Sequence, residues 1–440
     1  MIDWGERILC ILLSLCILGN ALLVRRIVRA WAFPAVLFAL AWFAYTIIPL
    51  VCFPSAHVYP AAMLYILGAT VAVSAASMST WKTAFATSAI IKAPYRDYYS
   101  DRFFLVLFFI GFALSVACLL MNSIVQGISL TQLFTNINDS AAEYAGRRYG
   151  YDISSNIYQQ SGTVLAYFCA GLGGLIVLSQ RNHYMKWGVA ISALFPSIFV
   201  MISQSAKGML FLSAAIFLGG ILSDRIQHNK TSLFSKRAIP AAIVGLVVTI
   251  SLVTVSFLSR GMSSVADRDL IDALAPYWAS YTSGHLFAFS DWFGNYIGEA
   301  SAQSYDDPGL TQGFYTFMSI FKLFGDDRYV PNGVYSEYLS IPPYIQTNIY
   351  TSFRGMIHDF GLAGSLICIA SLSFFAHKAF RSMLISSKPS FSVAAFIFST
   401  AFIYQSFLIS SLTWTTLPIG IFLVGIVLYI TRFKLNYQAM

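Results

Sequence analysis

The chain has 440 residues, of which 57% are hydrophobic and only 10% are charged. This composition excludes an ordinary soluble domain, because apolar runs long enough to cross a bilayer, about 20 residues each, recur along the chain. On a soluble protein the net charge of +8 would suggest a nucleic-acid partner. On a membrane protein its distribution matters more than its sum, and we expect no nucleic-acid partner.

Eleven apolar runs predict transmembrane helices, so we expect an all-α polytopic membrane protein. The first run follows Asp3 and Glu6, precedes the basic stretch RRIVR and lacks an A-x-A cleavage pattern, so we interpret it as a mature helix rather than a secretory signal. In chain order the predicted spans are residues 7–24, 32–51, 61–80, 103–124, 157–179, 187–204, 208–223, 239–258, 354–376, 391–411 and 414–431.

The connections between these spans alternate in charge. One set, which includes the C-terminal tail, carries 18 Lys and Arg against three acidic residues, whereas the other set carries 9 against 16. The positive-inside rule assigns the first set to the cytoplasm. We therefore predict that the N-terminus faces outward and that the C-terminus is cytoplasmic.

Two outward connections are long, and they divide the chain. Residues 1–258 are predicted to form a first membrane bundle that includes the outward connection 125–156, residues 259–353 a large outward loop, and residues 354–440 a second bundle with the last three spans. No clear internal repeat occurs, and the helix centres carry almost no charge. We therefore expect chemistry or binding at the outer face rather than alternating access.

The large loop is too aromatic and apolar for a disordered linker, and DDPG and VPNG mark turns within it. Short helices at 265–275 and 286–299 are expected to lie in the membrane interface. The loop either closes the bundle as an aromatic belt or forms a sugar-binding groove, in which aromatic faces would stack on sugar rings and polar side chains would bond hydroxyl groups. The candidate glycan-binding residues are His285, Asp291, Trp292 and Tyr350.

Several basic residues are predicted to face outward near helix ends. Each alone has a structural explanation, as an interface residue whose side chain reaches toward water or as the partner of a nearby acid. Around an acidic outward surface they together suggest anion recognition, and a diphosphate would accept bidentate hydrogen bonds from arginine. The candidate diphosphate-binding residues are Arg147, Arg148, Lys207, Arg260 and Arg354.

The segment TNIYTSFRGMIHDFGLAG opens the ninth predicted span with three ionisable groups. Arg354 and His358 are four residues apart, so a helix places them on one face, whereas Asp359 is rotated by about 100° from His358. The outward helix N-terminus would favour a phosphate. His358 could act as a general base near neutral pH, and Asp359 could tune it or act itself. The alternative is structural, an Arg354–Asp359 pair with His358 as a polar cap.

Sequence signals for a metal or cofactor are weak. The chain has no H-E-x-x-H motif, no Cys–His cluster, no P-loop and no nucleotide fingerprint, and its six cysteines show neither metal spacing nor a disulfide framework. DRD at 267–269 is a poor match for a metal-binding Asp-x-Asp motif. We expect no metal and no cofactor, so a transferase would use a preactivated lipid donor.

The topology and the segment around Arg354 resemble the Wzy-type O-antigen polymerases, which polymerise oligosaccharide repeat units. These often carry a segment like TNVYTxFRxxxxDFG before a helix. The SQSAKGMLF turn is similar to a family turn in which arginine is common where this chain has Lys207, and Arg260 fits a basic position after span eight. The matching residues of the segment are Thr347, Asn348, Tyr350, Thr351, Phe353, Arg354, Asp359, Phe360 and Gly361.

The resemblance implies a multi-pass protein of the bacterial inner membrane whose active site faces the periplasm. Such a polymerase transfers the growing glycan from undecaprenyl diphosphate to the non-reducing end of the next lipid-linked unit, without a metal, and can work with a polysaccharide co-polymerase that regulates chain length. Cations would bind the departing diphosphate, and His358 or Asp359 would deprotonate the acceptor or orient the base.

Three alternatives stay open at this stage. An O-antigen ligase would use the same donor but transfer the glycan to lipid A-core. A lipid-linked oligosaccharide flippase or other transporter would need functional polar residues within its helices and a cavity open to both sides. A non-catalytic assembly or receptor protein would use the aromatic loop as a partner surface.

Overall fold

The computed structural model describes residues 3–80, 99, 102–150, 152–153, 155–233, 239–258, 270–305, 307, 309–331, 333–342, 345–386 and 389–437. Within these residues the chain forms 15 helices and one two-stranded sheet. The chain divides into two compact units. The first takes its described residues from Met1–Ile90, Ala275–Arg381 and Phe402–Thr415, and the second from Ile91–Leu274, Ser382–Ala401 and Thr416–Met440.

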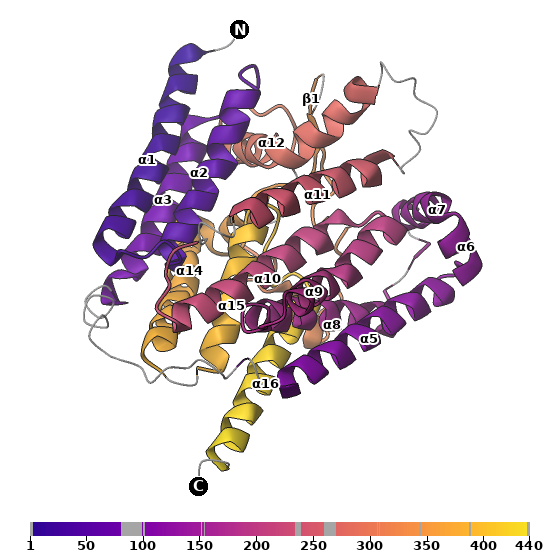
Figure 1. Cartoon of the computed structure of the whole chain (residues 1–440). Coiled ribbons are helices and arrows are strands. Elements are labelled where there is room, and N and C mark those ends of the chain that lie inside the picture. The colour runs from indigo at the N-terminus through magenta and orange to yellow at the C-terminus, as the bar shows by residue number, and fades with distance from the viewer. Residues whose placement is uncertain are drawn as a thin grey trace. The chain divides into compact units, whose positions relative to one another are not determined.

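The first unit begins with three helices that pack against one another (Figure 1). The Asp3 side chain accepts hydrogen bonds from the first free amides of α1, and α2 and α3 each begin with proline, whose missing N–H costs nothing at a helix start. The elements of this unit are α1 (Trp4–Val28), α2 (Pro34–Cys52), α3 (Pro60–Ala76), most of α12 (Leu270–Tyr296), α13 (Met318–Leu323), β1 (Leu339–Ile341), β2 (Ile345–Thr347) and most of α14 (Thr351–Ile385).

The second unit is built around α8, which packs against α5, α9, α10 and α16. Small residues allow this close packing: every residue from Ala166 to Ile176 is buried, and five of them are alanine or glycine, at 166, 170, 171, 173 and 174. The elements of this unit are α5 (Arg102–Val125), α6 (Leu130–Thr135), α7 (Ile137–Tyr149), α8 (Ile157–Ile176), α9 (His183–Gln204), α10 (Lys207–Gln227), α11 (Ile239–Leu258) and most of α15 (Phe391–Gln405) and α16 (Thr416–Tyr437).

Gly174 of α8 and Gly220 of α10 lie at a close helix crossing. A Cβ atom on Gly174 would sit 2.2 Å from the Phe217 carbonyl oxygen, which is backbone and cannot turn aside. Gly174→Ala is therefore expected to destabilise the protein by about 2 to 3 kcal/mol and to lower its melting temperature by several degrees in detergent. Gly188→Ala on α9 is the matched control, because no atom lies within 4 Å of its added Cβ. Equal melting temperatures would contradict this packing.

Seven helices among the described residues are long and apolar enough to cross a membrane, which indicates a multi-pass membrane protein. They are Trp4–Val28, Pro34–Cys52, Pro60–Thr80, Arg102–Val125, His183–Gln204, Lys207–Gln227 and Thr351–Ile385, and each overlaps a predicted span. The four other predicted spans correspond to α8, α11, α15 and α16, which are helical but fall short in length or hydropathy over their described residues. The predicted all-α membrane fold is confirmed at this level.

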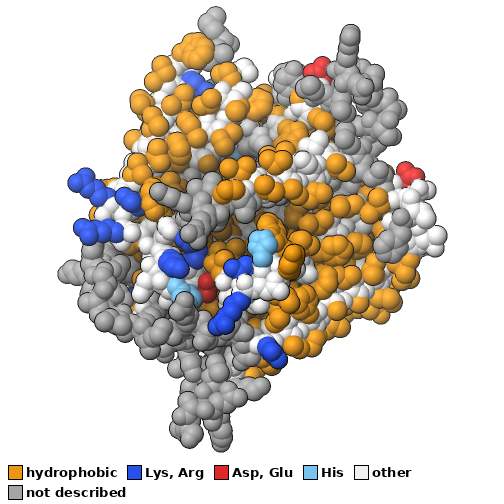
Figure 2. Space-filling model, viewed as in Figure 1, with side chains coloured by type: hydrophobic (Ala, Val, Ile, Leu, Met, Phe, Trp, Pro, Cys, Tyr) orange, Lys and Arg blue, Asp and Glu red, His pale blue; other side chains and the backbone are white. Residues whose placement is uncertain are grey.

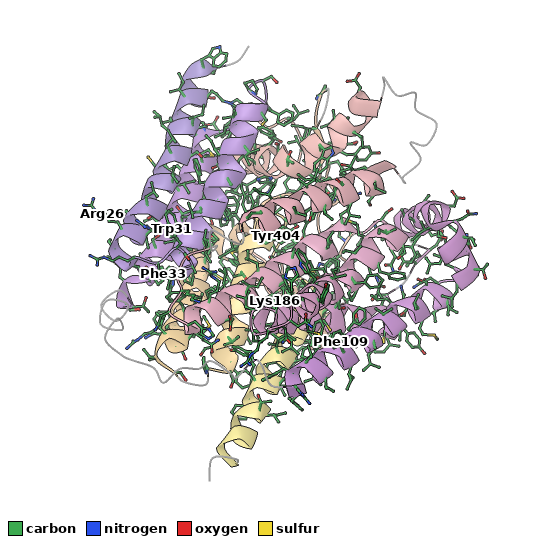
Figure 3. The ribbon with its side chains drawn as sticks, viewed as in Figure 1. Arg26, Trp31, Phe33, Phe109, Lys186 and Tyr404 are labelled. Carbon is green, nitrogen blue, oxygen red and sulfur yellow. The ribbon has the colours of Figure 1, made fainter. Side chains whose placement is uncertain are left out.

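Apolar side chains cover the outer surfaces of several of these helices. Hydrophobic atoms dominate the visible face over α1 and over α5 (Figure 2), where Leu23 is 58% exposed and Val106 is 57% exposed. Exposed apolar surface on this scale is expected where lipid, not water, is the neighbour. Arg26 and Trp31 lie at the C-terminal end of α1 (Figure 3), and the Arg25 guanidinium lies 4.7 Å from the Trp31 ring centre. Basic and aromatic residues of this kind are typical of a membrane–water interface.

The large loop differs from its prediction in one respect. Residues 286–296 of the expected short helix at 286–299 belong to a single 27-residue helix, α12, which ends at Tyr296. The part of the other expected helix that precedes residue 270 lies outside the described residues. Gly284 does not break α12. It lets the β1–β2 hairpin approach, since a Cβ there would lie 2.8 Å from Thr347. The hairpin is antiparallel and pairs Leu339 with Thr347.

Helix α14 is fixed to α2 at two levels. The Phe353 ring stacks on Trp42 with 4.5 Å between ring centres. Further along, the His377 Nδ1–H donates to the Ser373 carbonyl oxygen over 2.6 Å, which leaves Nε2 to accept the Ala35 amide over 3.1 Å at the start of α2. The first contact holds the opening turn of α14 against α2, and the second holds the later part of α14 against the start of α2.

Candidate functional site

The first turns of α14 form a short helical segment of their own. Thr351 has a φ of 67°, and its hydroxyl oxygen accepts the Phe353 amide over 3.2 Å, as a helix cap does. At Gly361 the backbone leaves the helical region, with φ 68° and ψ −179°. Only glycine adopts that conformation without strain, so residue 361 separates Thr351–Phe360 from the longer apolar part of α14.

Arg354 makes the central ion pairs of this segment. Its Nη2 donates to Asp307 Oδ1 over 2.7 Å and to Glu337 Oε1 over 3.0 Å. The arginine side chain is 1% exposed, whereas both carboxylates are 19% exposed. A buried charge is tolerated only when it is paired and hydrogen-bonded, and two carboxylates satisfy that requirement here. Arg354 thus ties the start of α14 to two distant points of the large loop.

Four aromatic rings enclose the Arg354 guanidinium, and we call them the aromatic cage. Rings at such distances attract a cation electrostatically, and the attraction grows as water is excluded. The Nε and Nη1 atoms of Arg354 donate no hydrogen bond to a described residue. The cage consists of Trp292, Tyr305, Tyr335 and Tyr350, whose ring centres lie 5.5, 5.2, 4.1 and 4.4 Å from the guanidinium carbon.

His358 lies one turn after Arg354 on the same face. Its Nε2 is 3.4 Å from Asp307 Oδ2, and its ring packs against Tyr315 with 5.2 Å between ring centres. Neither ring nitrogen makes a hydrogen bond to a described residue. Asp307 Oδ2 also accepts the Trp292 Nε1–H. We call Arg354, Asp307, Glu337 and His358 the Arg354 cluster.

Asp359 points away from the Arg354 cluster and holds residues 311–316, here called the strap. Its Oδ1 accepts the Thr311 hydroxyl over 2.5 Å and the Tyr315 amide over 3.0 Å, and its Oδ2 accepts the Thr316 amide over 2.6 Å. The Thr311 amide in turn donates to the His358 carbonyl oxygen over 3.1 Å. Asp359 is therefore not the partner of Arg354, and its oxygens are occupied by the strap.

The candidate glycan-binding residues have different environments. Trp292 and Tyr350 belong to the aromatic cage, and Asp291 accepts the Tyr305 hydroxyl over 2.8 Å at its edge. His285 is buried between Tyr45 and Phe407, and its Nε2 donates to the Tyr45 carbonyl oxygen over 2.9 Å. Burial lowers the pKa of His285 to about 4, so the ring is neutral at pH 7 and acts as a packing residue.

The other predicted basic sites belong to the second unit. Lys207 is buried with its Nζ 3.9 Å from the Phe257 ring centre. Arg147 donates to the Gln126 carbonyl oxygen over 2.6 Å, and Arg148 is half-buried. Arg260 lies outside the described residues. Lys207 and Arg147 are thus engaged within their own unit, and the role of these basic residues toward a diphosphate stays a prediction.

Sequence reasoning missed both carboxylates of the Arg354 cluster. Asp307 and Glu337 come from irregular parts of the loop, 47 and 17 residues before Arg354. The available signal was the loop's alternation of acids with tyrosines, as in VYSEY around Glu337. Burial raises the pKa of Tyr350 to about 12 and also raises the pKa of Tyr335, so these cage phenols stay protonated at neutral pH.

Among the described residues, no group of three His, Cys, Asp or Glu side chains could hold a metal ion. Comparison of the chain with protein-family models, curated proteins and solved structures finds no match. The function must therefore be inferred from the chemistry of the Arg354 cluster, its aromatic cage and the strap.

Proposed function

We propose that this chain polymerises lipid-linked oligosaccharide repeat units at the periplasmic face of a bacterial inner membrane. The observation that carries the proposal is the buried Arg354 cluster, because a fold with seven membrane-length helices concentrates carboxylates, a histidine and four aromatic rings at one helix start. Ionisable groups in such apolar surroundings are costly, and they are typical of sites where chemistry or binding occurs.

The orientation of this proposal rests on the charge pattern. The connections rich in Lys and Arg would be cytoplasmic, and the interface residues Arg26 and Trp31 at the end of α1 belong to that side. The start of α14, on the opposite side in the eleven-span arrangement, would face the periplasm. The large loop would then meet lipid-linked glycans that have reached the outer leaflet.

Each part of the Arg354 cluster suits a step of glycan transfer. The aromatic cage and its neighbouring polar groups offer surfaces of the kind that bind sugars. The Nε and Nη1 donors of Arg354 bond no described residue, and they would interact with a phosphate oxygen of the departing undecaprenyl diphosphate once the rings that enclose this buried side chain move apart. Because two carboxylates already share Nη2, further cations would be needed to balance a diphosphate, and Lys207, Arg260, Arg147 and Arg148 are the candidates.

A chromosomal deletion tests the polymerase proposal in cells. Loss of a polymerase leaves lipid A-core capped with single repeat units, whereas loss of an O-antigen ligase leaves uncapped core. We expect single capped units on a lipopolysaccharide gel, restored to long chains by the wild-type protein and by Arg181→Met, which removes an exposed arginine. Full-length chains in the deletion strain would contradict the proposal, and uncapped core would redirect it to the ligase.

A further inference from the structure

We propose that Glu337 is the group that accepts the proton of the acceptor hydroxyl, an inference that rests on the proposed function. The acceptor oxygen would bond to the anomeric carbon of the donor glycan while the bond from that carbon to the phosphate oxygen breaks. The hydroxyl proton would pass to Glu337 Oε2, and the bonding electron pair would leave with the undecaprenyl diphosphate. Sequence reasoning left this role to His358 or Asp359.

Hydrogen-bond occupancy separates Glu337 from the other carboxylates near Arg354. Asp307 accepts a hydrogen bond from Arg354 at Oδ1 and from Trp292 at Oδ2. Both oxygens of Asp359 accept hydrogen bonds from the strap. Glu337 uses Oε1 for Arg354, whereas its Oε2 accepts no hydrogen bond from a described residue. A carboxylate oxygen that already accepts strong hydrogen bonds is a poor proton acceptor. Glu337 thus retains the open oxygen.

Exposure separates Glu337 from His358. The His358 side chain is 4% exposed and is covered by Trp292 and Tyr315, whereas the Glu337 side chain is 19% exposed. A general base must come within hydrogen-bond reach of the proton that it removes. An acceptor sugar could therefore approach Glu337 without displacing the rings that enclose the histidine.

The surroundings of Glu337 fix its position. The Tyr350 hydroxyl donates to the Glu337 carbonyl oxygen over 3.2 Å, and the Asn348 amide donates to the neighbouring Tyr335 carbonyl oxygen over 3.3 Å. Glu337 lies two residues before the start of β1, whose partner β2 packs on α12. Backbone and carboxylate are thus held from two sides, which is the preorganisation that a proton acceptor requires.

The Glu337→Gln variant tests this role in lipid, with purified protein and undecaprenyl-diphosphate-linked repeat units. The amide oxygen can still accept from Arg354, so we expect a melting temperature near that of wild type and little change in KM. The turnover number should fall by about 100-fold or more, because a glutamine cannot accept the proton. Glu299→Gln, an exposed acid of the same loop, is the matched control and should keep wild-type turnover.

The pH–rate profile distinguishes a proton acceptor from a residue that merely balances Arg354. The wild-type rate should fall as acid protonates the base, and this limb should be absent in Glu337→Gln. Retention of the limb in Glu337→Gln and its loss in His358→Gln would overturn the inference, as would turnover of Glu337→Gln within threefold of wild type. If Glu337→Gln fails to fold, Glu337→Asp replaces it as the test. A proton acceptor that has been shortened should turn over more slowly, whereas a residue that only balances the charge of Arg354 should leave turnover unchanged. A wild-type protein that makes no polymer refutes the proposed function instead.

Discussion

Replacement of Arg354 by methionine is expected to abolish polymerisation and to destabilise the first unit. Methionine keeps the apolar stem of the side chain but leaves Asp307 and Glu337 without their shared donor. Breaking a buried ion pair from one side costs about 3 to 5 kcal/mol, and the partial exposure of both carboxylates favours the lower end. Turnover should fall by about 100-fold or more if the guanidinium also meets the departing phosphate.

The experiment compares Arg354→Met, Arg354→Lys and Arg181→Met by ladder formation and by thermal unfolding. Lysine keeps the charge, but its side chain is shorter than that of arginine and lacks the further Nε and Nη1 donors, so we expect partial stability and weak activity. Arg181→Met should match wild type in both measurements. Wild-type polymerisation by Arg354→Met would show that the Arg354 cluster is not the active site.

Loss of the Asp359 carboxylate is expected to reduce stability and activity together. Asp359→Ala would leave the Thr311 hydroxyl and the amides of Tyr315 and Thr316 without their acceptor. Each such donor, if it stays buried, costs about 1 to 3 kcal/mol, so we expect a total loss of about 3 to 5 kcal/mol. The strap carries Tyr315, which packs on His358, so a released strap should also disturb the Arg354 cluster.

Asp359→Asn separates the two roles considered for this residue. The asparagine NH2 group, which is a donor, would face a backbone N–H that needs an acceptor. The melting temperature should therefore fall along with the activity. A general base would behave differently, because the variant would lose activity while its melting temperature stayed unchanged. That second result would contradict the assignment of Asp359 to the strap.

Local patterns predicted the helices and one face of the candidate site. The spacing of Arg354 and His358 placed both on one side of a helix, and the structure has both in the Arg354 cluster. The same spacing predicted that Asp359 lies off that face. In the structure Asp359 points away from it and binds the strap. These predictions succeeded because they depend only on the geometry of neighbouring turns.

The partners of Arg354 could not be predicted in the same way. Asp307 and Glu337 reach it from segments without periodicity, where no spacing rule indicates which side chains meet. The break at Gly361 was also missed, since glycine inside an apolar run is common and its φ is set by tertiary packing. Likewise, α12 continues through Gly284, and the hairpin packs against that glycine.

Polymerisation by the purified wild-type protein in lipid is the most direct test of the proposed function. With undecaprenyl-diphosphate-linked repeat units as the sole glycan substrate, we predict a ladder of lengthening products and release of one undecaprenyl diphosphate for each linkage formed. A folded protein that releases no lipid diphosphate and makes no product longer than one unit, or that transfers glycan only when lipid A-core is supplied, would contradict the account.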